Sequence, residues 1–289
     1  PNHCSIALHM SIALGALFYP ALSRAGYDER FSLGLITTSG SLGLLFAPSL
    51  PLILYGVVAG ASIDDLFLAG VFPGLLMVLL LCVYSFFISR GIRTSLVDAS
   101  GRVVLASLRE SAWELPLPIV VLGGIYSGYF AVSEAAAVTA LYVVFVEIIV
   151  RREVPWANLP AIMRESMVLV GAIFMILGMS LASTNYMIYA GVPEMLFSIV
   201  DTYVAGPGSF LLALIIFLLI LGAILDIFSA IVLVVPLVLP VAIQYGIHPI
   251  HLGIVFLATM ELGYLTPPVG LNLFIASFRF ERSITDIYR

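Results

Sequence analysis

The sequence predicts an all-α membrane protein that crosses the lipid bilayer several times. Of its 289 residues, 62% are hydrophobic and only 10% are charged, whereas a soluble domain is about half apolar and about a quarter charged. Residues 66–88 contain no charged side chain and are long enough to cross about 30 Å of hydrocarbon as one helix. Residues 166–183 and 210–225 are further candidate spans, and all three lie too far inside the chain to be a cleaved signal peptide.

The positions of the basic residues predict which loops face the cytoplasm. All twelve are arginines, and they gather in residues 24–30, 90–109, 151–164 and 279–289. Arginine in short loops marks the cytoplasmic side of a membrane protein. The arginine-free segments 60–65, 185–208 and 245–251 are therefore expected to be external. This assignment requires that residues 110–150 enter from the cytoplasm and return to it, and that residues 209–245 do the same from outside.

Residues 209–244 are too short for two comfortable crossings joined by a loop. We interpret them as a re-entrant hairpin that dips into the membrane from outside, with its tip near Asp226 and Ser229. Non-helical backbone at membrane depth persists only where protein buries it or water reaches it, so a tip that carries an aspartate is a candidate functional site. The alternative is an ordinary helix pair with Asp226 near a membrane interface.

An internal repeat predicts the architecture. Residues 19–55 align without a gap with residues 239–275, so that glycines and prolines coincide at a constant offset of 220 positions (for example, 263 minus 43). The matched pairs are Pro20 with Pro240, Gly26 with Gly246, Gly43 with Gly263, and Pro48 with Pro268. The loop at 24–30 is predicted to be cytoplasmic, whereas its counterpart at 245–251 is predicted to be external. The two copies are therefore expected to lie antiparallel across the membrane, as an inverted repeat.

Each copy contains a glycine- and proline-rich interruption of an apolar stretch, "GLLFAPSLP" from residue 43 and "GYLTPPVG" from residue 263. Proline stops one half-helix and glycine allows a tight turn, which frees backbone carbonyls as hard oxygen ligands for a small cation. The half-helix after the prolines points its positive N-terminal end at the site, which favours an anionic substrate. A kink without function is the alternative, but it does not account for the same break in both copies.

With these motifs the chain resembles the large membrane subunit of a tripartite ATP-independent periplasmic (TRAP) transporter. The similarity runs from about residue 11 onward and is carried by residues 41–76, by residues 220–277, and by "GGIYSGYFAVSEAAAVTALY" at 123–142. It implies an elevator-type secondary transporter, in which a rigid scaffold holds a mobile domain built from two hairpins and two broken helices. Residues 1–65 and 209–289 would then belong to the transport domain, and residues 66–208 would form scaffold helices and connecting segments.

The resemblance also implies the function. Members of this family use sodium ions (Na+) to drive uptake of an organic acid, often a dicarboxylate or a sugar acid, across the cytoplasmic membrane of a bacterium or archaeon. A small membrane subunit and a periplasmic substrate-binding protein would complete the system.

The resemblance also implies which residues form the ion sites. In the family, sodium lies between each hairpin tip and the adjacent broken helix, held largely by backbone oxygens. The first site would lie near Gly43 and comprise Ser39, Gly40, Ser41, Gly43 and Pro48. The second would lie near Thr266 and comprise Asp226, Ser229, Glu261, Gly263, Thr266, Pro267, Pro268, Gly270 and Asn272. Thr266 could add a hydroxyl ligand or cap the following half-helix, and Asn272 could face the cavity or pack on a neighbouring helix.

Two glutamates are expected at membrane depth, where carboxylates usually mark ion paths or pair with a partner. Glu261 could tune the second ion site or accept hydrogen bonds from the hairpin backbone. Glu134 follows Ser133 at a predicted helix start, where an acidic side chain complements the helix dipole. We therefore expect Glu134 to cap that helix.

The chain departs from the family at both ends. It begins at about the tip of the first hairpin, its first residues lack the expected Ser-Gly-rich tip, and a final spanning helix after Arg289 is missing. We therefore expect a fragment or a degenerate copy, truncated at both ends, in which one of two ion sites is incomplete. The alternative function is a non-transporting scaffold or a channel-like membrane subunit.

Other functional classes find little support. The sequence has no HExxH motif, and His248 and His251 are too few ligands for a zinc site. It contains no lysine, so a phosphate-binding loop of the Walker type is excluded and the energy is expected to come from an ion gradient. We expect neither enzymatic activity nor a nucleic-acid partner.

Overall fold

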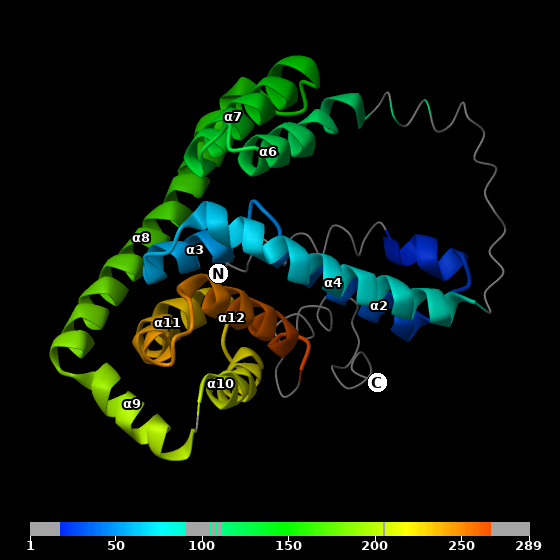
Figure 1. Cartoon of the computed structure of the whole chain (residues 1–289). Coiled ribbons are helices and arrows are strands. Elements are labelled where there is room, and N and C mark those ends of the chain that lie inside the picture. The colour runs from blue at the N-terminus through cyan, green and yellow to red at the C-terminus, as the bar shows by residue number, and fades with distance from the viewer. Residues whose placement is uncertain (1–17, 91–104, 106–107, 109–110, 205, 267–289) are drawn as a thin grey trace. The chain divides into compact units, whose positions relative to one another are not determined.

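The computed structural model describes residues 18–90, 105, 108, 111–204 and 206–266 of the chain (Figure 1). Every regular element in these ranges is helical, so the predicted all-α class is confirmed. Five helical segments of this described part are long and apolar enough to cross a membrane, as expected for a multi-pass protein. The chain divides into two compact units, one formed by residues 1–94 with 177–289 and the other by residues 95–176.

The first broken helix belongs to the first unit. It consists of α2 (Glu29–Leu42), the short 3-10 helix η1 (Gly43–Leu45) and α3 (Leu50–Ala59). Asp28 caps α2, because its side chain accepts a hydrogen bond from the Arg30 amide at 3.2 Å. Together the three elements form one apolar segment of 31 residues, which is long enough to cross the membrane in spite of its break.

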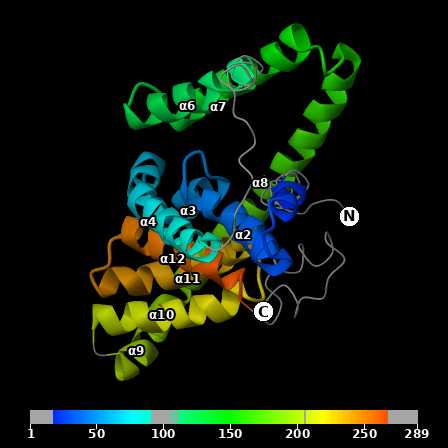
Figure 2. The ribbon, with the colours of Figure 1, turned by 90° about the vertical axis from the view of Figure 1, so that its right-hand side faces the viewer.

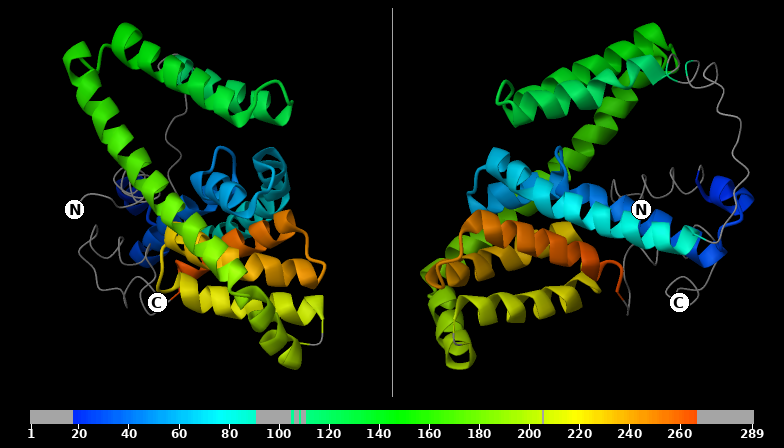
Figure 3. Two further views of the ribbon diagram at one scale, coloured as in Figure 1. Left: turned by 90° about the vertical axis from the view of Figure 1, so that its left-hand side faces the viewer. Right: turned by 45° about the vertical axis from the view of Figure 1, so that its right-hand side comes forward.

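Helix α4 (Ile63–Ser89) follows as an unbroken helix of 27 residues that contains the predicted span 66–88. Ser62 caps its start by accepting a hydrogen bond from the Asp65 amide at 3.3 Å. The helix packs on both α2 and η1, and α2 runs alongside it in Figure 3. Gly70 permits this approach, because a Cβ atom there would lie only 2.6 Å from the Leu45 carbonyl oxygen.

The C-terminal part of the same unit is a helical hairpin with a helix on either side of it in sequence. The helices are α9 (Val192–Tyr203), α10 (Pro207–Gly222), α11 (Ile227–Gln244) and α12 (Pro249–Gly263). Helices α10, α11 and α12 lie side by side, and α3 and α4 pack on them (Figure 2). The turn between α10 and α11 lies at residues 223–226, where the hairpin tip is predicted.

The two legs of the hairpin differ in length, so they do not decide between a re-entrant hairpin and an ordinary helix pair: α11, with 18 residues, is long and apolar enough to cross a membrane, whereas α10 is shorter. Its 16 residues rise about 24 Å, which is shorter than a hydrocarbon layer of about 30 Å. At the open end of the hairpin, the Tyr245 ring stacks on Phe210 and packs against Phe197 of α9. The distances between the ring centroids are 4.9 and 5.2 Å, respectively. The Tyr245 hydroxyl also donates to the Asp201 carboxylate at 3.3 Å, so α9 is tied to the base of the hairpin.

The two copies of the repeat share their backbone geometry at equivalent positions. Gly26 and Gly246 both adopt the left-handed conformation, with φ of 85° and 74°. Each of their amides donates to the carbonyl oxygen three residues earlier, at 3.1 and 2.9 Å. Two residues further on, Asp28 and His248 cap the next helix by accepting from the amide at i+2. The offset of 220 residues therefore holds in the structure as well as in the sequence.

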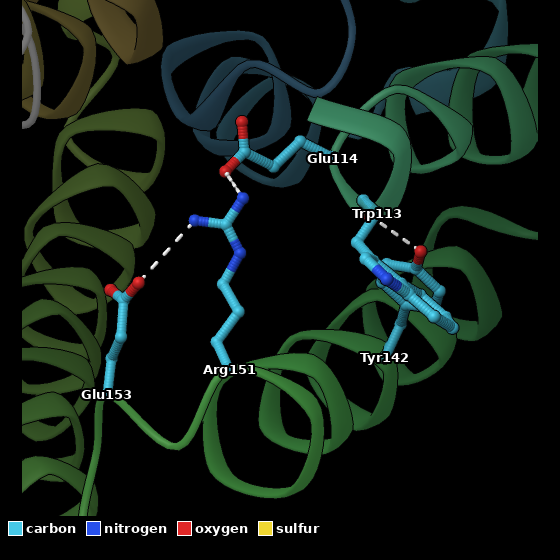
Figure 4. A network of polar contacts seen from close by, with 5 residues as sticks. All are labelled: Trp113, Glu114, Tyr142, Arg151 and Glu153. Atoms are coloured by element: carbon cyan, nitrogen blue, oxygen red, sulfur yellow. Dashed lines mark hydrogen bonds and ion pairs between the residues drawn. The ribbon is translucent and has the colours of Figure 1, made fainter. Parts of the chain in front are cut away.

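The second unit contains a helical hairpin closed by a polar network. Its elements are η2 (Ser111–Trp113), α6 (Pro116–Tyr126), α7 (Val132–Val144), the π-helix η3 (Phe145–Val150), η4 (Trp156–Asn158) and the first part of α8 (Leu159–Tyr189). In Figure 4, Arg151 lies between Glu114 and Glu153, with nitrogen–oxygen distances of 2.6 and 3.6 Å. The Tyr142 hydroxyl donates to the Trp113 carbonyl oxygen at 2.6 Å. These contacts join the segment before α6 to α7 and to the end of η3.

Two further sequence predictions, the cap at Glu134 and the membrane span at residues 166–183, are confirmed in α7 and α8. The Glu134 carboxylate accepts a hydrogen bond from the Ala131 amide at 3.1 Å, so its expected capping role is confirmed. Helix α8 begins in the second unit and ends in the first. It is one continuous helix of 31 residues that contains the predicted span 166–183 (Figure 3).

Candidate functional site

The first break separates α2 from α3 at residues 43–49. Ser49 bridges it, because its hydroxyl donates to the Leu44 carbonyl oxygen and accepts from an amide in the first turn of α3. Helix α3 therefore begins at the break and points its positive N-terminal end there. Gly43 and Pro48 are exposed at the break, and η1 packs on α12 and α4.

The polar residues just before this break are bonded to their own helix. Ser41 is buried and its hydroxyl donates to the Thr37 carbonyl oxygen at 3.3 Å. The Ser39 hydroxyl donates to the Ile36 carbonyl oxygen at 3.1 Å, and Gly40 between the two serines is buried. A hydroxyl group that donates its proton keeps its oxygen lone pairs, so the Ser39 hydroxyl can still offer an oxygen atom to a cation.

The second break begins where α12 ends at Gly263. The hydroxyl and the amide of Thr266 both donate to the Gly263 carbonyl oxygen, at 2.8 and 3.0 Å. The first break has the same turn 220 positions earlier, since the Phe46 amide donates to the Gly43 carbonyl oxygen at 3.2 Å. The predicted site residues Pro267, Pro268, Gly270 and Asn272 lie outside the described residues, so their roles stay predictions.

Asp226 holds the hairpin tip in shape. Its Oδ2 accepts hydrogen bonds from the amides of Phe228 and Ser229, at 3.0 and 3.1 Å, and its Oδ1 accepts from the Ser229 hydroxyl. The side chain therefore caps α11, a role that the sequence reading does not assign to it. A carboxylate has about four lone-pair sites, so Asp226 retains acceptor capacity at the tip.

The hairpin tip and the second break lie against each other. Gly222, the last residue of α10, packs on Gly263, and a Cβ atom added to Gly263 would lie 2.8 Å from the Gly222 Cα. Tyr264 follows directly and is 4% exposed. The structure therefore brings the predicted tip and the predicted second break into one neighbourhood.

The first break meets α12 at a different level. Leu45 and Ile254 both approach Gly70 of α4, since a Cβ atom at Gly70 would lie 2.6 Å from the Leu45 carbonyl oxygen and 3.7 Å from Ile254 Cδ1. Ile254 precedes Gly263 by nine residues, which corresponds to about 14 Å along the helix. Leu45 of the first break and Ile254 of α12 therefore meet at Gly70, well before the second break begins.

Glu261 is the most unusual polar side chain of the described part. It is 1% exposed, and neither carboxylate oxygen has a hydrogen-bond partner among the described residues. Helices α3, α4, η1, α10 and α11 pack on α12, and none of these elements contains an arginine or a histidine. Its counterpart in the first repeat is Ser41 (261 minus 220), whose hydroxyl donates within its own helix. A buried carboxylate without a partner is costly, so a cation, a proton or a group outside the described residues is needed to satisfy it.

Tyr55 joins the two repeats, and no local sequence pattern points to it. Its hydroxyl donates to the Pro249 carbonyl oxygen at 2.7 Å, across 194 residues of sequence. Its ring fills the space beside Gly253, where a Cβ atom would lie 2.4 Å from the ring, and it packs near Phe256 with 6.4 Å between ring centroids. Tyr55 therefore fixes the half-helix after the first break to the helix before the second.

Oxygen atoms are the ligands that these breaks could present to a small, hard cation. The described residues contain no group of three His, Cys, Asp or Glu side chains that could hold a metal ion. The last carbonyl groups of an α-helix lack partners within the helix. At the end of α12, however, the Leu262 carbonyl oxygen accepts from the Leu265 amide, and the Gly263 carbonyl oxygen accepts from both the amide and the hydroxyl of Thr266. The remaining backbone oxygens at the breaks, the hydroxyls of Ser39 and Thr266, and the carboxylate of Glu261 are the ligands that this part of the chain can offer.

Known proteins resemble the chain over almost its whole length. The sequence profile of the family described as "Tripartite ATP-independent periplasmic transporter, DctM component" matches residues 7–289. The C4-dicarboxylate TRAP transporter large permease protein DctM of Pseudomonas aeruginosa is 37% identical over 266 residues, which cover 92% of this chain and 62% of the relative. The sialic acid TRAP transporter large permease protein SiaM of Vibrio cholerae is 36% identical, covering 91% of this chain and 62% of the relative.

A third relative is named for a different substrate. The ectoine TRAP transporter large permease protein TeaC of Halomonas elongata is 30% identical over 280 residues, which cover 96% of this chain and 65% of the relative. The chain thus spans about three fifths of the length of these three relatives. Because the profile covers residues 7–289 and identity reaches 37% over 92% of the chain, the chain belongs to the DctM family of tripartite ATP-independent periplasmic transporters, a family of permeases rather than enzymes.

Proposed function

We propose that the chain acts in a sodium-driven secondary transporter that imports an organic acid across the cytoplasmic membrane of a bacterium or archaeon. In this proposal the two broken helices and the α10–α11 hairpin form the ion sites of an elevator-type transport domain. The arginine-rich loops face the cytoplasm. A small membrane subunit and a periplasmic substrate-binding protein are the proposed partners.

One observation carries the proposal. Helix α2 ends at Leu42, directly before Gly43, and α12 ends at the equivalent Gly263. The same turn follows each glycine, and the second glycine meets a hairpin tip. Inverted-repeat transporters place their sites at such broken helices, where unwound carbonyls bind the ion and half-helix N-termini face the substrate. A kink that only bends a membrane helix would not need a matching partner in a second copy.

The proposed ion and substrate residues keep the two groups defined above. The first group is Ser39, Gly40, Ser41, Gly43 and Pro48, and the second is Asp226, Ser229, Glu261, Gly263 and Thr266, continued by Pro267, Pro268, Gly270 and Asn272. Backbone oxygens near Gly43 and Thr266 are the main sodium ligands. The positive start of α3 attracts the anionic group of the substrate.

The substrate class is proposed from chemistry and from relatives. The relatives named above are called transporters of a C4-dicarboxylate, of sialic acid and of ectoine. Two of these are carboxylic acids without a permanent cation, which agrees with the positive N-terminus of α3 at the first break. We therefore propose a dicarboxylate or a sugar acid as the substrate.

Reconstitution in liposomes tests this function. The protein is inserted together with its small membrane subunit, the binding protein is added outside with radiolabelled C4-dicarboxylate or sialic acid, and uptake is measured with and without an inward sodium gradient. Uptake that requires the sodium gradient supports the proposal. Flux that ignores the ion gradient would support a channel instead, and absence of any flux with both labels and all three components would support a scaffold.

A further inference from the structure

We propose that Gly222 sets the ion-size selectivity of the second cation site, as a positioning residue that lets the hairpin tip approach the helix break backbone to backbone. The inference deepens the proposed function and rests on it. Neither the family resemblance nor the repeat assigns a role to Gly222.

The contact is between main chains and is reciprocal. A Cβ atom on Gly263 would lie 2.8 Å from the Gly222 Cα and 3.2 Å from the Leu219 carbonyl oxygen. A Cβ atom on Gly222 would lie 3.1 Å from both the Gly263 Cα and the Met260 carbonyl oxygen. Backbone atoms cannot rotate away as a flexible side chain can, so a methyl group at either glycine must push α10 and α12 apart.

The turns on both sides of the contact are held by hydrogen bonds. The distance between α10 and α12 at the two glycines therefore determines the distance between the turns that carry the proposed ligands. On one side, Asp226 lies four residues after Gly222 and its carboxylate closes the turn through Phe228 and Ser229. On the other side, Thr266 lies three residues after Gly263 and closes its turn onto the Gly263 carbonyl oxygen. The glycine pair therefore fixes the distance between the turn at residues 222–226 and the turn at residues 263–266, which carry the proposed oxygen ligands.

The distance between these two turns should decide which cation fits. The radii of lithium, sodium and potassium ions differ by tenths of an ångström, which is the scale of the shift that a methyl group at Gly222 requires. A wider site holds sodium at longer oxygen distances and disfavours it relative to potassium, since cavity size is one source of ion selectivity. Gly43, the counterpart of Gly263, has no described atom within 4 Å of its Cβ position, so this close contact is a feature of the second break in the described part.

The test compares ion-dependent stabilisation of the purified protein. The midpoint of thermal unfolding is titrated with LiCl, NaCl and KCl at constant ionic strength for the natural protein, Gly222→Ala, Gly263→Ala and Gly171→Ala. Gly171 lies in α8 and has no described atom within 4 Å of its Cβ position, so its variant controls for the loss of a glycine in a membrane helix. We expect Gly222→Ala to weaken apparent sodium affinity about tenfold and to raise the affinity for potassium relative to sodium. Gly263→Ala should have the larger effect and Gly171→Ala none.

The outcomes separate this inference from the proposed function. If the natural protein shows no preference among the three cations, the proposed sodium function fails. If it prefers sodium and Gly222→Ala keeps the same affinity and the same order of cations, the role of Gly222 is overturned while the function stands. If Gly222→Ala does not fold, hydrogen exchange of the natural protein decides. Joint protection of residues 222–226 and 263–266 by sodium supports the inference, and protection of only one segment or of neither overturns it.

Discussion

At the scale of single residues, Glu261 is the clearest departure from an ordinary membrane helix. It replaces a serine of the first repeat with a buried carboxylate that has no described hydrogen-bond partner. A neutral hydroxyl at Ser41 is satisfied by its own helix, but a carboxylate has no proton to donate when ionised. When Glu261 is ionised, the two copies of the repeat differ in charge at the same position, and a cation is then attracted more strongly to the second.

Glu261→Gln tests this difference. The amide keeps the shape of the side chain but removes its charge, so we expect apparent sodium affinity to fall about tenfold in thermal-unfolding titrations. The sodium-free midpoint should stay the same or rise, because an unpaired buried carboxylate carries a desolvation cost. Glu194→Gln in α9, where the side chain is exposed, is the control and should change neither value. A lower sodium-free midpoint with an intact sodium response would show instead that Glu261 holds the fold together.

Several residues of the site could not be predicted from the sequence. Tyr55 reaches Pro249 across 194 residues, and a lone tyrosine in an aliphatic helix has no periodic pattern that identifies its partner. Gly222 looks like any small residue in an apolar run, although it precedes the predicted tip by only four positions. Glu134 is the opposite case, because a helix cap acts over three residues and is therefore visible in the local sequence.

At the scale of elements, both ends of the first break are fixed by short-range hydrogen bonds. Ser49 connects the end of η1 to the start of α3 through one hydroxyl group. The helices themselves were predictable, because apolar runs of 18 or more residues produce spans such as α4 and α8. The breaks were predictable only through the offset of 220 residues, because one glycine–proline cluster alone does not distinguish a break from a kink. The bonds across them depend on side-chain rotamers, which the offset does not specify.

Ser49→Ala and Ser62→Ala form a matched pair at this scale. Each serine caps a helix through a hydrogen bond from an amide, to α3 and α4 respectively, so each alanine should lower the free energy of unfolding by about 1 kcal/mol. Only Ser49 also bridges the break, so only Ser49→Ala should weaken the sodium-dependent rise in the unfolding midpoint. The measurement is thermal unfolding of both variants with and without sodium. Equal sodium responses would contradict a role of the Ser49 bridge in the ion site.

At the scale of the whole molecule, the arginine map predicts the side of the membrane on which each loop lies. The loop between α3 and α4, residues 60–62, is expected outside, and residues 151–158 are expected inside. The helical assignment agrees with several crossings, but length and apolarity are the same in either direction. Only the flanking charges give the orientation.

Cysteine labelling of intact cells measures this orientation. In a background with Cys4→Ser and Cys82→Ser, Ala61→Cys is expected to react with a membrane-impermeant maleimide added outside, whereas Ala157→Cys is expected to react only after the membrane is permeabilised. Position 157 is exposed in its unit, so labelling after permeabilisation serves as the positive control. The reverse pattern would place the arginine-rich loops outside and contradict the predicted topology.

The cap at Asp226 affects more than the start of α11. The Asp226 carboxylate closes the hairpin turn by accepting from the amides of Phe228 and Ser229. The conformational entropy of the turn residues, about 1–2 kcal/mol for each backbone unit, is therefore lost when the chain folds. The turn is therefore already ordered before a cation binds, so the binding free energy is not reduced by the cost of ordering these residues.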